Sequence, residues 1–166
     1  MVYGRSGHQL AHLHKRFEYQ TKDYLFAIGS KYPDETAKKC EVYEVAKNKW
    51  TEIAEMNQSR HFHSVCVLDG RYLYVIGGRD SQNEQPLETI ERLDGYGDLE
   101  KQKWEPVLFV NRENNWSARD TMGSFPLNDS EILIFGGDCL RSDGDIYSIL
   151  LMTSSGVFQD GRKAQR

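Results

Sequence analysis

Two pairs of histidines are the residues of this chain whose spacing most resembles a chemical site. His12 and His14, and His61 and His63, alternate along strand-like segments, so each pair points to one face and could offer two nitrogens to a metal ion. No cysteine or carboxylate nearby in the sequence completes a clear ligand set. We therefore interpret both pairs as structural and expect no metal site.

Two other patterns resemble ligand loops. Asp138, Asp143 and Asp145 look superficially like a calcium loop, but the ligand spacing and the closing glutamate of an EF-hand are absent. The glycine pairs 77–78 and 136–137 could be taken for phosphate-binding turns, yet no helix pattern follows either of them. We expect solvated loop acids in the first case, and glycines that permit a bend and a close backbone approach in the second.

The sequence also lacks a recognisable nucleophile. It has no Gly-x-Ser-x-Gly elbow and no cysteine with a readable histidine and acid partner. Cys40, Cys66 and Cys139 are odd in number, widely spaced and close to apolar segments, which is typical of reduced thiols used as apolar filler. We expect no catalytic residue and no cofactor.

Composition narrows the class of protein. A chain of 166 residues that is 39% hydrophobic and 28% charged is long and apolar enough for a globular core. The net charge of −4 argues against a surface built to bind nucleic acid or an anionic membrane. No apolar run is long enough to span a bilayer or to serve as a secretory signal, so we expect a cytoplasmic protein.

An internal repeat organises the chain. The segment YLYVIGG at 72–78 returns as EILIFGG at 131–137 and, with one glycine lost, as YLFAIGS at 24–30. Arg60 precedes Gly77 by 17 residues, and Arg119 precedes Gly136 by the same 17. Two spacings that agree indicate a repeated unit of about fifty residues.

Each repeat reads as four short strands, because no window shows a convincing helical period. In the middle repeat, Asp69 and Gly70 are typical of the tight turn of a hairpin. A four-stranded sheet with two apolar faces must stack on a neighbour, and radial stacking of such sheets is a β-propeller. The expected strands are 17–20, 24–28, 40–45 and 49–53, then 64–68, 72–76, 87–94 and 103–107, then 121–127, 131–135, 145–151 and 156–159.

A family resemblance follows from these residues. The segment RHFHSVCVLDGRYLYVIGG at 60–78 and the seven-residue interval from Tyr43 to Trp50 resemble the kelch repeat, over roughly residues 12–158. The resemblance implies a packing or hydrogen-bonding role for His63. It also implies structural motif roles for eight residues, namely Gly29, Tyr43, Trp50, Gly77, Gly78, Trp104, Gly136 and Gly137.

The chain also departs from the kelch pattern. Ser30 replaces the second glycine of the first repeat, and Leu93 stands where the second repeat should carry its tyrosine. Four extra residues precede Trp104 in the segment GYGDLEKQKW, and the third repeat offers only Phe158 in place of the tryptophan. The first and third repeats are therefore degenerate.

The resemblance implies an all-β fold, a partial kelch-type β-propeller of about three four-stranded antiparallel blades. Such propellers typically close with five to seven blades, so we expect a fragment, a ring completed by further blades or a second chain, or an open arc with exposed edge strands. The expected units are an N-terminal extension at 1–11, repeats at 12–53, 54–107 and 108–159, and a polar tail or the start of a missing blade at 160–166.

The loops at one end of a propeller are the expected partner-binding surface. Trp116 lies in a polar linker and is a candidate anchor, although it could equally cover a seam between blades. Arg60 and Arg119 occupy the leading arginine position, where the resemblance implies contacts with acidic peptides; the alternative is a hydrogen bond to neighbouring loop carbonyls. Arg112 and Tyr32 complete the candidate set.

We therefore expect a non-catalytic protein-protein interaction module that acts as a substrate receptor or scaffold. Its partners would be proteins, with an acidic motif as one option, and neither nucleic acid nor membrane. The alternatives are a fragment of a kelch-like propeller enzyme of the sugar oxidase or sialic acid epimerase type, and a structural subunit of a cytoskeletal assembly.

Overall fold

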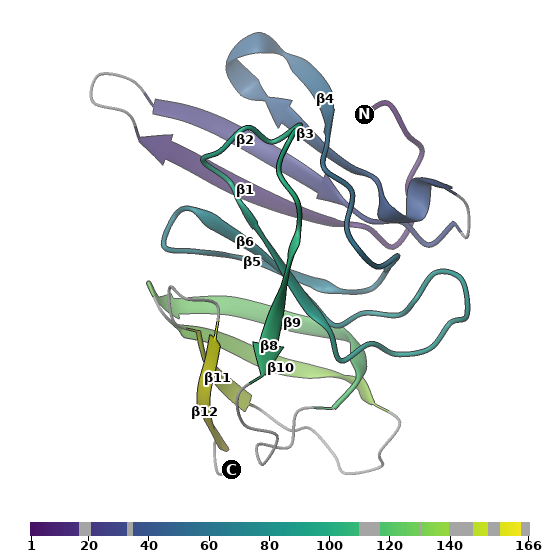
Figure 1. Ribbon diagram of the computed structural model, residues 1–166, viewed down its shortest axis with the longest axis vertical. Coiled ribbons are helices and arrows are strands. Elements are labelled where there is room, and N and C mark those ends of the chain that lie inside the picture. Colours follow the sequence, from purple (N-terminus) through teal and green to yellow (C-terminus); the bar gives the residue numbers. More distant parts are fainter. Residues whose placement is uncertain are drawn as a thin grey trace.

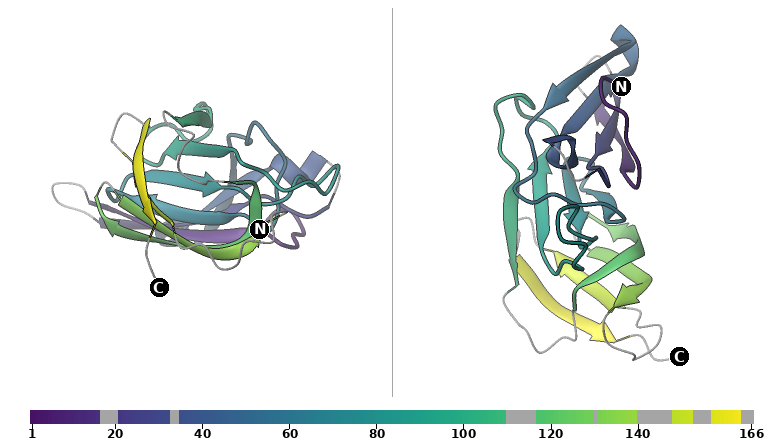
Figure 2. Two further views of the ribbon diagram at one scale, coloured as in Figure 1. Left: turned by 90° about the horizontal axis from the view of Figure 1, so that it is seen from below. Right: turned by 90° about the vertical axis from the view of Figure 1, so that its right-hand side faces the viewer.

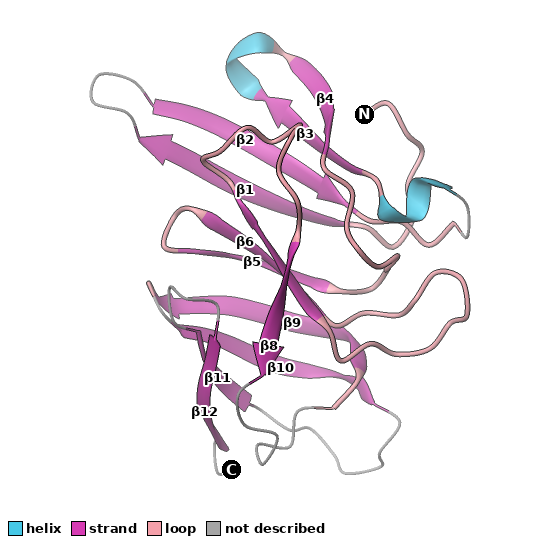
Figure 3. Ribbon diagram, in the orientation of Figure 1, coloured by secondary structure: helices cyan, strands magenta, loops and turns pink. Residues whose placement is uncertain are grey.

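The structure, a computed structural model, describes residues 1–16, 21–32, 35–109, 117–129, 131–139, 148–152 and 157–163. Within them the chain is all-β, with only two short 3-10 turns, η1 at Glu35–Lys38 and η2 at Val45–Lys47 (Figure 3). The strands are β1 Gln9–Arg16, β2 Thr21–Ile28, β3 Cys40–Glu44, β4 Lys49–Ile53, β5 Ser64–Leu68, β6 Tyr72–Ile76, β7 Ile90–Asp94, β8 Glu105–Phe109, β9 Arg119–Asn128, β10 Glu131–Cys139, β11 Ser148–Met152 and β12 Val157–Lys163.

The strands form three four-stranded antiparallel units in chain order, which we call blade 1 (β1–β4), blade 2 (β5–β8) and blade 3 (β9–β12). Figures 1 and 2 show them stacked one after another, with blade 2 in the middle. Blades 2 and 3 are also joined at their edges, because β12 pairs in parallel with β8 at Val157↔Leu108 and Phe158↔Phe109. This pairing was not expected, and it satisfies two edge strands that the array would otherwise leave unpaired.

The middle blade matches the expectation most closely. Strands β5 and β6 occupy the expected 64–68 and 72–76, and the turn between them has φ values of 54° at both Asp69 and Gly70. Positive φ at both central residues is what a two-residue hairpin turn requires. Strand β7 begins at Ile90, three residues later than expected, and β8 begins at Glu105.

The first strand of blade 1 is a correction. It is Gln9–Arg16, whereas the sequence suggested 17–20, which lies outside the described residues. Its inward side chains are Ala11, Leu13 and Lys15, and its outward ones include Leu10 beside polar residues, so the two-residue apolar period is weak. The N-terminal extension expected at 1–11 therefore contributes to blade 1, and β12 similarly runs into the tail expected at 160–166.

Both faces of blade 2 are buried, because successive side chains of β6 point alternately into two hydrophobic cores. Leu73 and Val75 join the cluster shared with blade 1, while Tyr74 and Ile76 join the cluster shared with blade 3. A strand covered on both faces reads as a continuous apolar run, as YLYVI does. The stacking that the repeat required is thus present on both sides of the middle blade.

The glycines after the second strands of blades 1 and 2 bring neighbouring blades into contact. Gly77 has φ of 56°, and a Cβ added there would lie 2.6 Å from the carbonyl oxygen of Arg119 and from Met122 Cε. Gly29 has φ of 72°, and its added Cβ would overlap the carbonyl oxygen of Arg60. The leading arginine of each following blade therefore passes directly over a glycine that has no room for a side chain.

The aromatic positions of the motif pack as expected of structural residues. Tyr43 and Trp50 face each other across β3 and β4 with ring centroids 5.2 Å apart, and Tyr43 Oη donates to Asn48 Oδ1 at 2.6 Å. Trp104 is buried, and its Nε1 donates at 2.9 Å to the carbonyl oxygen of Ala54 in the link between blades 1 and 2. The Tyr43–Trp50 contact stabilises the β3–β4 hairpin, and the Trp104 hydrogen bond joins blade 2 to the link from blade 1.

Alanine substitutions at Gly70 and Gly77 distinguish the energetic cost of a positive φ from the cost of a clash between neighbouring blades. Both glycines have positive φ, but a Cβ at Gly70 would meet nothing within 4 Å. Gly70→Ala should lower the unfolding free energy by about 1 kcal/mol. Gly77→Ala should lower it by the same amount and by an additional ~1–3 kcal/mol, because the new Cβ would clash with the next blade. Chemical denaturation measures both losses. Equal losses would contradict the close contact at the seam.

Candidate functional site

The connections at one end of the array form the candidate surface. We call this surface the loop end; it comprises residues 29–32 and 35–39 of the β2–β3 connection, the link between blades 1 and 2 at 54–63, the β6–β7 connection at 77–89, and residues 117–118 (Figure 1, right-hand side). Because the β2–β3 and β6–β7 connections occupy equivalent places in successive blades, they emerge side by side. The candidate partner-binding residues were expected at this end.

Arg60 lies beneath the loop end rather than on it. Its side chain is 0% exposed, and Nη1 donates to the carbonyl oxygens of Gly77 at 2.8 Å and Thr89 at 3.0 Å. Nη2 donates to Thr89 Oγ1 at 3.0 Å and forms an ion pair with Glu91 at 2.7 Å. The expected partner contact at Arg60 is therefore replaced by its alternative, hydrogen bonds to neighbouring carbonyls.

Arg5 repeats this arrangement in blade 1. Its Nη1 donates to the carbonyl oxygens of Gly29 at 2.9 Å and Lys39 at 2.7 Å, and its Nε and Nη2 donate to Glu41 Oε2 at 3.0 and 2.8 Å. Both side chains of the Arg5–Glu41 pair are buried. Sequence reasoning missed Arg5 because it lies 24 residues before Gly29, not 17. The matching signal was a glutamate 12 residues after Gly29, as Glu91 lies 14 after Gly77.

The remaining candidates differ in placement. Arg119 is buried, with Nε donating to the carbonyl oxygen of Ser117 at 3.3 Å and Nη2 to Ser117 Oγ at 3.2 Å. Its burial is a second correction to the expected contact with an acidic peptide. Arg112 and Trp116 lie outside the described residues. Tyr32 is 49% exposed on the β2–β3 connection, and its role in binding stays a prediction.

Hydrogen bonds fix the backbone of the loop end. Asp80 Oδ1 accepts from the Gln82 amide and from Ser59 Oγ, both at 2.8 Å. Ser81 Oγ donates at 2.6 Å to the carbonyl oxygen of Ser30, which ties the β6–β7 connection of blade 2 to the β2–β3 connection of blade 1. A surface whose loops are already ordered loses less conformational entropy when it binds a partner.

A second cross-blade contact lies beside it. Arg79 donates to Asp120 Oδ2 through Nε at 3.0 Å and Nη2 at 2.7 Å, which joins the β6–β7 connection to the start of β9. The amide of Gly78 donates to the carbonyl oxygen of Arg119 at 2.8 Å across the same seam. The connections of successive blades are therefore held in register.

Comparison with known proteins identifies the repeated unit. A family model described as the kelch motif matches residues 59–107, which is blade 2 with its incoming link. The chain is a kelch-repeat protein. A RING finger domain and kelch repeat-containing protein of Dictyostelium discoideum is 30% identical over 89 residues, which is 54% of this chain and 8% of that protein.

Two further relatives match shorter stretches of this kelch-repeat protein. Beta-scruin of Limulus polyphemus is 49% identical over 66 residues, covering 40% of this chain and 7% of the relative. Human kelch-like protein 13 is 34% identical over 74 residues, covering 42% and 11%. The chain thus spans about a tenth of the length of the curated relatives it matches.

The histidine pairs of this kelch-repeat protein have structural surroundings. His12 Nε2 and His14 Nδ1 lie 2.8 and 2.9 Å from Asp23 Oδ1 on the neighbouring strand, a carboxylate distant enough in sequence to have been missed. His63 is fully buried beneath Gly29 and Gly78. Within the part of the chain that the structure describes, no group of three or more His, Cys, Asp or Glu side chains could hold a metal ion.

No helix among the described residues has the length and apolar character needed to cross a bilayer.

The Arg60–Glu91 pair should contribute strongly to stability. Arg60→Met leaves the carboxylate of Glu91 buried without its cation, and we expect a loss of about 3–5 kcal/mol of unfolding free energy. Arg71→Met is the matched control, because Arg71 and Asp94 form a 2.7 Å ion pair that is far more exposed. Urea denaturation should show a much smaller loss for the control. Similar losses of unfolding free energy in the two variants would contradict the claim that burial makes the Arg60–Glu91 pair more important for stability than an exposed ion pair.

The unfolding free energy should also decrease as the pH is lowered, because the fold keeps His63 neutral. Burial lowers the pKa of His63 well below 6.5, and the charges of Arg60, His61 and His8 add to this effect. Below about pH 6.5 the unfolded chain binds a proton that the folded chain does not, so the unfolding free energy falls by up to about 1.4 kcal/mol per pH unit. Burial also lowers the pKa of His8 and of His61, which act in the same direction.

Denaturation of wild type and His63→Leu between about pH 7.5 and about pH 5.5 tests this dependence. The variant should have a shallower slope, with the remainder due to His8 and His61. An unchanged slope would show that His63 is not kept neutral by the fold.

Proposed function

We propose that this kelch-repeat chain is a non-catalytic protein-binding module that contacts its partner through the loop end. The observation that carries the proposal is the ordering of this end by the Arg60–Glu91 pair and by the cross-blade bonds of Ser81 and Arg79. Fixed loops that present exposed polar side chains suit recognition of a protein surface.

Tyr32 is the described residue best suited to anchor a partner. Its side chain is 49% exposed, while its amide donates to Ser30 Oγ at 3.3 Å. Ser30 is bound in turn by Ser81, so Tyr32 stands beside the junction of two connections. Tyrosine and tryptophan are enriched among residues that dominate interface energies. Trp116 and Arg112 remain proposed contacts from the following link.

Burial of Arg60 and Arg119 removes the support for an acidic partner motif. Among exposed residues of the loop end, Lys31 carries a positive charge, and Glu35, Glu55, Glu84 and Glu88 carry negative charges. The Nζ of Lys31 lies 5.7 Å from the ring centroid of Phe62, which fixes the position of that positive charge. The predominance of negative charge does not favour an acidic partner, so the proposal specifies a protein partner without an acidic motif.

A substrate-receptor or scaffold role is the finer form of this proposal. Two relatives combine kelch repeats with another domain by name: the Dictyostelium protein has a RING finger, and an F-box/kelch-repeat protein of Arabidopsis thaliana is 29% identical over 85 residues, 51% of this chain and 29% of the relative. We propose that further blades, or a second chain, complete the ring around the three blades.

We propose the cytoplasm as the compartment in which this module acts. Cys40 and Cys66 are free, buried thiols, and burial raises the pKa of each to about 12. Thiols that remain protonated and enclosed serve as apolar filler, in keeping with a reducing compartment.

Tyr32→Ala tests the binding surface. Quantitative affinity purification with the full chain identifies a partner, and titration of the purified partner then measures the dissociation constants. Tyr32→Ala should weaken binding about tenfold or more, whereas Tyr96→Ala should not, because Tyr96 is similarly exposed, at 42%, but lies on the β7–β8 connection at the other end. Weaker binding by Tyr96→Ala but not by Tyr32→Ala would contradict the proposal that the loop end is the binding surface.

A further inference from the structure

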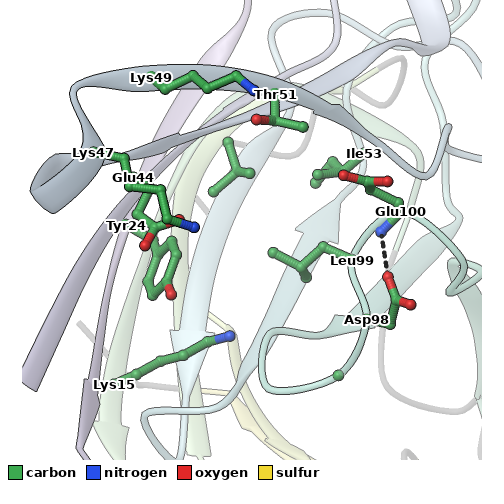
Figure 4. Close-up of a pocket in the computed structure, with 12 residues that line it drawn as sticks. Lys15, Tyr24, Glu44, Lys47, Lys49, Thr51, Ile53, Asp98, Leu99 and Glu100 are labelled. Carbon is green, nitrogen blue, oxygen red and sulfur yellow. Dashed lines mark hydrogen bonds and ion pairs between the residues drawn. The ribbon is translucent and has the colours of Figure 1, made fainter. Parts of the chain in front are cut away.

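A cavity of about 340 Å³ lies between blades 1 and 2, at the end opposite the loop end (Figure 4). Blade 1 contributes residues of β1 to β4 and of η2, from the β3–β4 hairpin along β4 as far as Ile53, and blade 2 contributes residues 97–100 of the β7–β8 connection. We call it the seam cavity. Its volume is within the range of small-molecule sites.

The extra residues before Trp104 build one wall of the seam cavity. Leu99 packs against the core shared by blades 1 and 2, and its carbonyl oxygen accepts from the Ala54 amide at 3.0 Å. The amides of Lys101 and Gln102 donate to the carbonyl oxygen of Asp98 at 3.1 and 3.0 Å. This departure from the repeat pattern thus folds into a fixed wall across the seam.

Lys15 extends a largely buried side chain, which ends in an ammonium group, into this cavity. The residue is 5% exposed, and Figure 4 shows its side chain extending into the space between the two blades. Its Nζ lies 4.7 Å from the ring centroid of Tyr24 and 5.4 Å from that of Tyr96, both cation-π distances. Among the described residues, no carboxylate forms an ion pair with Nζ.

The electrostatic surroundings of Lys15 leave its charge incompletely compensated. Burial lowers the pKa of Lys15, attraction to Asp94 and Glu44 opposes this effect, and Lys22 adds to it. Glu44 is already paired with Lys47 at 2.9 Å, and Asp94 with Arg71 at 2.7 Å. An anion that entered the seam cavity would supply the missing partner and raise the pKa of Lys15.

The rest of the lining defines the kind of anion. Val42, Ile53 and Leu99 offer apolar surface. The lining carboxylates Glu44, Asp98 and Glu100 offset the charges of Lys15, Lys47 and Lys49, so the cavity has no net positive charge that would favour ligands with several negative charges. A ligand with one carboxylate and an apolar body satisfies both features.

We propose that the seam cavity binds a carboxylate ligand whose anionic group pairs with Lys15 Nζ and whose apolar part lies against Val42, Ile53 and Leu99. A free small acid and an acidic side chain of a peptide share this chemistry. The proposal is independent of partner binding at the loop end, because the two surfaces share no residue.

Titration of the full chain with sodium benzoate tests the proposal, with lysine side chains labelled with carbon-13 at Cε for NMR. Benzoate should shift the Lys15 signal and raise the pKa of Lys15, and neutral benzamide should do neither. Inorganic phosphate should bind more weakly than benzoate. Absence of a Lys15 shift with benzoate, or an equal shift with benzamide or phosphate, would overturn the assignment.

Variants locate the site without relying on one fold-sensitive substitution. Lys15→Met should weaken benzoate binding at least about tenfold, and Lys15→Arg should retain part of it. Lys49→Met is the matched control, because Lys49 also lines the seam cavity but is exposed. Equal loss in Lys15→Met and Lys49→Met would overturn the role of Lys15. The benzoate and benzamide comparison in wild type decides the proposal if Lys15→Met does not fold.

A second arm distinguishes the two sources of the carboxylate. Short capped peptides that carry glutamate or glutamine at one position are titrated beside benzoate. A glutamate peptide that binds more tightly than benzoate assigns a peptide side chain, and the opposite order assigns a free small acid. If neither carboxylate affects Lys15, the proposal fails.

Discussion

The buried ion pair between Arg60 and Glu91 is the interaction on which the arrangement of the blades depends. A guanidinium group can be enclosed only where a carboxylate and several acceptors surround it, because an unpaired buried charge is very costly. Glu91 and the carbonyl oxygens of Gly77 and Thr89 meet this requirement at 2.7 to 3.0 Å. The incoming link, the glycine turn and the third strand of blade 2 must therefore meet at one point.

The same constraint recurs between blades. Arg5 and Glu41 form the corresponding buried pair in blade 1, and the backbone of each following arginine then passes over a glycine of the preceding blade. Gly29 and Gly77 thus each contact two groups: the arginine side chain of their own blade, which donates to their carbonyl oxygens, and the backbone of the next blade. Ordering of the loop end follows from this constraint, since the β2–β3 and β6–β7 connections begin at these glycines.

The two ends of the array offer different chemistry. At the loop end, cross-blade hydrogen bonds hold exposed side chains such as Tyr32 on fixed backbone, which suits a protein partner. Toward the opposite end, an irregular connection lines the seam cavity, into which the side chain of Lys15 extends. The regular part of the repeat thus supports one proposed surface, and a departure from it creates the other.

Local pattern predicted the middle blade well and its side-chain roles poorly. Strands β5 and β6 were readable because apolar residues and the Asp69-Gly70 turn agree within thirteen residues. Strand β1 was not, because Leu10 on its exposed face and Lys15 on its buried face break the alternation of apolar and polar residues.

Burial of Arg60 depends on Glu91, 31 residues away, and Arg5 depends on Glu41, 36 residues away. The extra residues before Trp104 were visible in the sequence, yet their folding across the seam depends on the contact between Leu99 and Ala54. Long-range polar partners and close approaches of backbone are set by the assembled blades, so single-sequence reasoning could name the residues but not their surroundings.

Hydrogen exchange at the Gly78 amide tests most directly whether the seams hold the blades together. This amide donates across the seam to the carbonyl oxygen of Arg119. If the glycine and arginine contacts join the blades into one cooperative unit, Gly78 should exchange as slowly as the amides within β6. Exchange of Gly78 many times faster than that of β6 would show that the blades open independently, and would contradict the account.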